Sequence, residues 1–220
     1  MIVAAVVIGY GGLAVYEAVT QTEAARVSAS VQLAENQAEN MNRALGSVSV
    51  FADESPGGNA SQTESQPTIS ETSDIDTLID HWEPLYKDAK LAYVKFEAAI
   101  DNAKTSAIRY FTAQRELTES ITNPATKAQA QQDDDRDWAL YRKWESQADS
   151  ALAKAQAIGT QLDDMDAVLR KLELRTDFVF DASSFQEIPA AISELNAELG
   201  EFRAASESIR AVTASPFEAN

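Results

Sequence analysis

Apolar residues recur every three or four positions along most of the chain, which is the spacing of one face of an α-helix. In the first fifty residues this stripe is uninterrupted by Pro or Gly between Leu13 and Leu45. We predict one long helix over 1–51. A stripe this narrow buries too little surface alone, so we expect it to lie against another helix, of this chain or of a second copy. The residues expected to pack in this way are Val27, Val31, Ala34, Ala38, Met41 and Leu45.

The first sixteen residues, Met1 to Tyr16, carry no charged side chain. A helix needs about 20 apolar residues to span a bilayer, so the run is slightly short. We predict a single-pass membrane anchor over 1–19, followed by a helical stalk over 20–52, with the rest of the protein extracytoplasmic. A cleaved signal peptide and a buried helix of a soluble assembly are the alternatives. Small residues at Ala5, Gly9 and Gly12 would allow a second helix to pack closely.

The next stretch, 53–73, is rich in Pro, Gly, Ser, Thr and Glu, which is typical of a flexible linker. Helical periodicity then resumes, and we predict an antiparallel helical bundle over 74–214 with a tail over 215–220. The second helix has an unusually wide apolar face, which favours packing against more than one neighbour. Ser73 or Asp74 is its expected cap, and Pro84 is expected to kink it or to reset its start.

Asn123 and Pro124 mark the strongest boundary between helices. Asn is a favoured cap and Pro is favoured at the first helical position, so we predict a new helix from Pro124 to about Leu174. The connection is short, which predicts an antiparallel hairpin that brings Phe111 close to Trp138. The pattern breaks over 175–185, where Phe178 and Phe180 predict either a plug over the bundle end or a contact for a partner.

A fourth helix follows, and the sequence Ser184 to Glu187 has the form of a capping box at its start. The predicted fold is therefore all-α. It consists of a long N-terminal anchor and stalk helix, then an antiparallel three-helix, coiled-coil-like bundle. If the stalk folds back on the bundle, it becomes a fourth helix.

The net charge of −17 predicts no nucleic-acid binding, because phosphate groups would be repelled and no basic patch stands out. The absence of Cys excludes disulfides, thiolate metal sites and a Cys nucleophile. His81 is the only histidine, so a di-iron site built from paired His ligands is excluded. The run Asp163, Asp164 and Asp166 is interpreted as a solvated helix face. We predict no catalytic, cofactor or metal site, and no enzyme.

The aromatic residues Trp138, Tyr141 and Trp144 are explained most simply as core residues. Together with Phe178 and Phe180 they are also the residues we would assign to a ligand or partner contact. The leading functional hypothesis is a membrane-anchored, non-enzymatic structural subunit that acts through helix–helix contacts, with itself or with other proteins. The alternatives are a sensor or ligand-binding bundle at the membrane surface, and a filament subunit packed through its apolar N-terminal helix.

Overall fold

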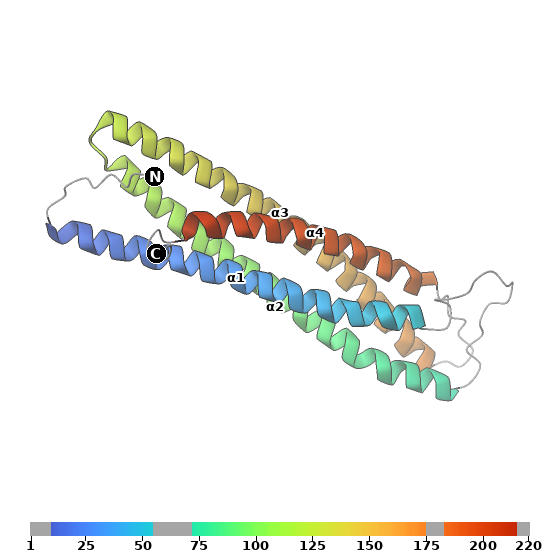
Figure 1. Cartoon of the computed structure of the whole chain (residues 1–220). Coiled ribbons are helices and arrows are strands. Elements are labelled where there is room, and N and C mark those ends of the chain that lie inside the picture. The colour runs from blue at the N-terminus through green and yellow to red at the C-terminus, as the bar shows by residue number, and fades with distance from the viewer. Residues whose placement is uncertain (1–9, 55–71, 175–182, 215–220) are drawn as a thin grey trace. The chain divides into compact units, whose positions relative to one another are not determined.

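The described residues of the computed structural model, 10–54, 72–174 and 183–214, form four helices and no strand (Figure 1). Helix α1 is Tyr10–Glu54, α2 is Thr72–Glu119, α3 is Pro124–Leu174 and α4 is Ser183–Thr213. The predictions of an all-α fold and of bundle packing are confirmed. The residues 1–9 of the predicted anchor lie outside the described part, as do most of the predicted linker and all of 175–182.

The prediction of a single-pass membrane protein is wrong. None of the helices in the described residues is long and apolar enough to cross a membrane. The physical reason lies in the polar residues of α1: the uncharged run within this helix ends at Tyr16, and Glu17, Thr20 and Glu23 follow within two turns. A span of about 20 apolar residues is not reached.

The chain forms two compact units, and each long helix contributes one segment to each of them. The first unit contains the described residues of Met1–Glu35, Ala98–Ala148 and Glu201–Asn220, and the second contains those of Asn36–Glu97 and Asp149–Gly200. In each unit the helix segments run antiparallel to their neighbours in the sequence (Figure 1). Neither unit is a continuous stretch of the chain, so every helix has to be in place before either core is complete.

Large aromatic side chains fill the core of the first unit. Phe111 of α2 meets Trp138 edge to face, with ring centroids 5.7 Å apart, as the hairpin about Asn123 predicts. Trp144 of α3 packs on Phe202 of α4 at 6.0 Å. The indole Nε1 of Trp144 also donates a hydrogen bond of 2.9 Å to Ser206 Oγ, and both side chains are fully buried.

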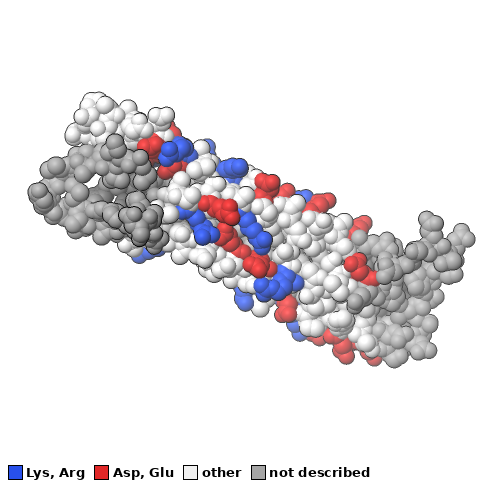
Figure 2. Space-filling model, viewed as in Figure 1, with Lys and Arg blue, Asp and Glu red and all other residues white. Residues whose placement is uncertain are grey.

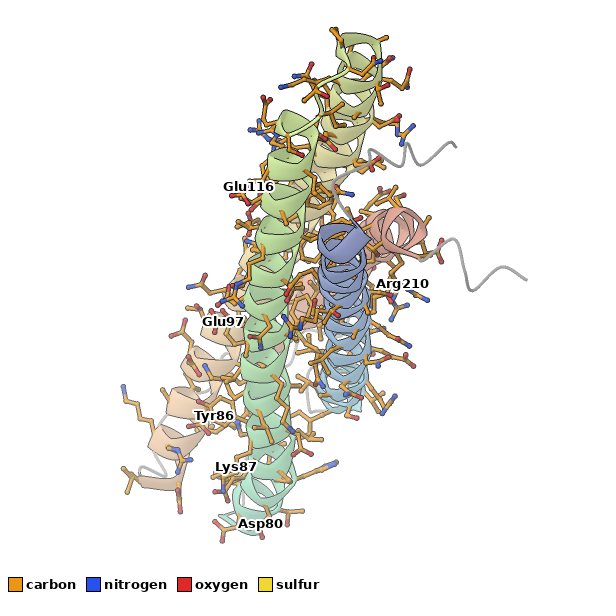
Figure 3. All side chains as sticks on the ribbon, turned by 90° about the vertical axis from the view of Figure 1, so that its left-hand side faces the viewer. Asp80, Tyr86, Lys87, Glu97, Glu116 and Arg210 are labelled. Atoms are coloured by element: carbon orange, nitrogen blue, oxygen red, sulfur yellow. The ribbon has the colours of Figure 1, made fainter. Side chains whose placement is uncertain are left out.

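Helix α1 belongs to both cores, which favours the alternative in which the predicted stalk folds back. In the first unit, Arg210 of α4 forms an ion pair of 3.1 Å with Glu35 of α1, and Figure 3 shows Arg210 beside this helix. In the second unit, Phe51 of α1 packs against Trp82 of α2 with centroids 5.5 Å apart. The seam residues Ala38, Met41, Leu45 and Val48 are buried there as well.

The predicted start of α3 is confirmed, whereas α2 and α4 begin earlier than their predicted caps. Asn123 Oδ1 accepts hydrogen bonds from the backbone N–H groups of Ala125 and Thr126, at 3.0 and 3.1 Å, so the predicted cap of α3 is confirmed. Helix α2 begins at Thr72, before its predicted caps, and runs through Pro84 without a new start. Helix α4 begins at Ser183, one residue before the predicted capping box.

Replacing the cap tests the boundary between α2 and α3. We expect Asn123→Ala to lower the free energy of unfolding by about 1 kcal/mol, because two N–H groups at the start of α3 lose their acceptor. Asn123→Asp should retain most of the stability. Thr122→Ala is the matched control, since the Thr122 side chain is exposed. Urea unfolding measures all three variants, and equal losses from positions 122 and 123 would contradict the role of the cap.

The buried hydrogen bond between Trp144 and Ser206 gives a second stability test. Ser206→Ala leaves the buried indole N–H without its acceptor, so we expect a loss of about 1–3 kcal/mol in the free energy of unfolding. Ser208→Ala on the same helix is the control, because its hydroxyl is exposed and bonds only the Ala204 carbonyl of its own helix. Denaturant titration followed by Trp fluorescence measures both, and the prediction is wrong if the two serine variants are equally stable.

Candidate interaction surface

The residues predicted to pack helices are found in two places. Val27, Val31 and Ala34 are buried in the first unit, and Ala38, Met41 and Leu45 are buried in the second. Ala5 and Gly9 lie outside the described residues, and only the backbone of Gly12 is described. The seam of α1 is therefore occupied by the chain's own helices over its described length.

The aromatic residues considered for ligand or partner contact are core residues where they are described. Tyr141 lies between Phe111 and Trp144, with ring centroids 5.5 and 6.0 Å away. Trp138 is half-buried, and the guanidinium carbon of Arg115 lies 5.2 Å from its ring centre. Phe178 and Phe180 lie outside the described residues.

The Asp-rich run on α3 also bonds α2, which its interpretation as a solvated face did not include: Asp163 and Asp164 are exposed, and Asp166 is half-buried. Tyr86 Oη donates to Asp163 Oδ1 at 2.7 Å, and Lys90 Nζ bonds the other oxygen at 2.9 Å. One turn away, Trp82 Nε1 donates to Asp166 Oδ1 at 3.3 Å. The hydrogen bond to Asp163 raises the pKa of Tyr86 to about 12.

These contacts hold α2 to α3 in the second unit, and Figure 3 shows Tyr86 on the side of α2 that faces α3. The sequence shows three acids on a helix but not what faces them, so the interpretation missed their role. Within the described part of the chain, no group of three His, Cys, Asp or Glu side chains is placed to hold a metal ion.

A polar cluster in the first unit surrounds the phenol of Tyr110. Gln114 Nε2 donates to Tyr110 Oη at 2.7 Å. Burial, followed by the charges of Asp137 and Asp134, raises the pKa of Tyr110 to about 12. Burial also raises the pKa of Asp134, whose Oδ2 atom has no hydrogen-bond partner among the described residues. Burial therefore favours the protonated form of the Tyr110 phenol and shifts Asp134 in the same direction.

One pair of large apolar side chains is exposed on the second unit. Leu91 and Val94 of α2 lie three residues apart and are 52% and 54% exposed, while Ala92 and Phe96 face the core. Lys87 and Lys95 stand four residues before and after Leu91, on the same face of the helix. We call Lys87, Leu91, Val94 and Lys95 the α2 ridge. The other exposed large apolar side chains of the described residues are separated from one another along the chain: Leu33, Val50, Ile108 and Leu174.

The same unit has a groove of about 640 Å³ between α3 and α4. Its lining includes Ala153 and Ala157 from α3 and Ala190 and Ala191 from α4, with buried Ile158. The other lining residues are charged or polar: Lys154 and Glu194 form an ion pair of 2.7 Å, Glu187 is exposed, and Gln161 Oε1 is buried without a hydrogen-bond partner among the described residues. We call this the α3–α4 groove.

Much of the remaining surface is charged and mixed. On the face shown in Figure 2, Lys and Arg lie next to Asp and Glu, so no extended basic patch is visible there. His81 is exposed and its ring meets Phe51 edge to face, with centroids 5.2 Å apart. Among the described residues, the α2 ridge and the α3–α4 groove differ from an ordinary solvated helix face, one by its adjacent exposed apolar side chains and the other by its hollow.

Comparison of the chain with models of protein families, with curated proteins and with solved structures found no match in any of the three. Functional inference for this chain therefore depends on its own surfaces and contacts.

The buried phenol of Tyr110 predicts a loss of stability at alkaline pH. Its pKa is raised from 10 to about 12, so the stability gained from the protonated phenol is complete below pH 10 and is lost as the pH rises to about 12. We expect the wild-type protein to lose about 2–3 kcal/mol more than Tyr110→Phe over this window. Denaturant unfolding at a series of pH values measures the difference. Parallel pH curves for the two proteins would contradict the prediction.

Proposed function

We propose that this protein is a non-enzymatic structural subunit that acts through helix–helix contacts in an oligomer or a larger assembly. The α2 ridge carries the proposal. It places two neighbouring apolar side chains in solvent on a helix whose opposite face is already buried in the second unit. Single exposed apolar residues are ordinary on protein surfaces, whereas adjacent ones favour a contact with a partner.

The spacing of the ridge suits packing against another helix. Lys87, Leu91 and Val94 follow each other at intervals of four and three, as residues do along one seam of a helix pair. Charged side chains of both signs border the apolar pair, Lys87 and Asp88 before it and Lys95 and Glu97 after it. An apolar contact with a polar rim is the usual arrangement of an interface. Charges in that position select partners and speed association more than they add affinity.

The free energy gained by covering the ridge is enough to contribute to an interface but too small to hold one together alone. Fully burying a Leu or Val side chain stabilises by about 1.5–3 kcal/mol, and roughly half of each side chain is still exposed here. Covering both would therefore contribute about 1.5–3 kcal/mol to association. That is a small part of the free energy of a stable interface, so other surfaces of the chain must take part.

The ligand-binding alternative has less support. A site for a small molecule is a concave space lined by apolar and aromatic groups. Tyr141 and Trp144, the strongest aromatic candidates, are packed against Phe111 and Phe202 in the first unit. The filament alternative depends on residues before Tyr10, which lie outside the described part of the chain.

Charged substitutions on the ridge test the proposal. We expect Leu91→Glu/Val94→Glu to weaken the native assembly roughly tenfold or more, because about 1.5–3 kcal/mol of apolar contact is lost and charge is placed in the interface. Sedimentation of the full chain in fresh extracts of its own cells measures the size of the complex. Both positions are exposed, so the free energy of unfolding should change by less than about 0.5 kcal/mol per substitution.

Val50→Glu is the matched control. Val50 lies on α1 in the same unit and is 55% exposed, nearly the same as Val94, but it has no exposed large apolar neighbour within four residues. We expect this variant to leave the complex unchanged. The proposal fails if the ridge variant sediments like the wild-type protein, or if Val50→Glu disrupts the complex to the same extent.

A further inference from the structure

We draw no further inference here: the strongest candidate, the α2 ridge as a docking surface for one defined partner, is bordered by charges of both signs, and nothing in the described part of the structure shows what covers it.

Discussion

A helix with a narrow apolar stripe is stable only against other helices, and the described structure satisfies this constraint along each of its four helices. The stripes of α1 to α4 are buried against one another in two units, each built from separate stretches of the chain. The core is assembled from many small side chains and a few large ones. Alanines such as Ala103, Ala148 and Ala151 allow close packing, and Trp82, Phe96, Trp144 and Phe202 supply most of the large buried surfaces.

Repetitive seams create a problem of register, because sliding one helix by a heptad again brings apolar residues into contact. Specific polar contacts remove this ambiguity. The indole N–H of Trp144 donates to Ser206, and a shift of α3 along α4 would break this bond. Trp82 and Tyr86 of α2 likewise donate to Asp166 and Asp163 of α3 in only one alignment of the two helices. The ion pair of Glu35 with Arg210 acts similarly for α1, although burial outweighs the arginine and raises the pKa of Glu35.

Once the inward faces are buried, the outward faces decide what the protein can bind. On the face shown in Figure 2, acidic and basic side chains lie next to one another among uncharged residues, and such mixing of both signs favours solvation and disfavours unselective contacts. The α2 ridge and the α3–α4 groove depart from that pattern within one unit, one projecting and one hollowed.

The sequence by itself determined the helices and much of their pairing. Periodicity identifies all four helices, Asn123 and Pro124 place the start of α3, and the short hairpin places Phe111 near Trp138. These features depend on local backbone chemistry or on counting along two adjacent helices. The membrane anchor was predicted from a run that is apolar only up to Tyr16, and the described helix does not meet the length that a bilayer requires.

Only the tertiary structure decided which polar residues meet and which apolar residues are left outside. The sequence shows Asp163 and Asp166 only as acids on one helix. In the structure, Tyr86, Lys90 and Trp82 of α2 form hydrogen bonds with them. Leu91 and Val94 belong to an apolar-rich helix. They are exposed because α2 is rotated so that Ala92 and Phe96 face the core. The physical reason is that local chemistry sets a helix and its boundaries, whereas its rotation and the groups it faces depend on every helix packed around it.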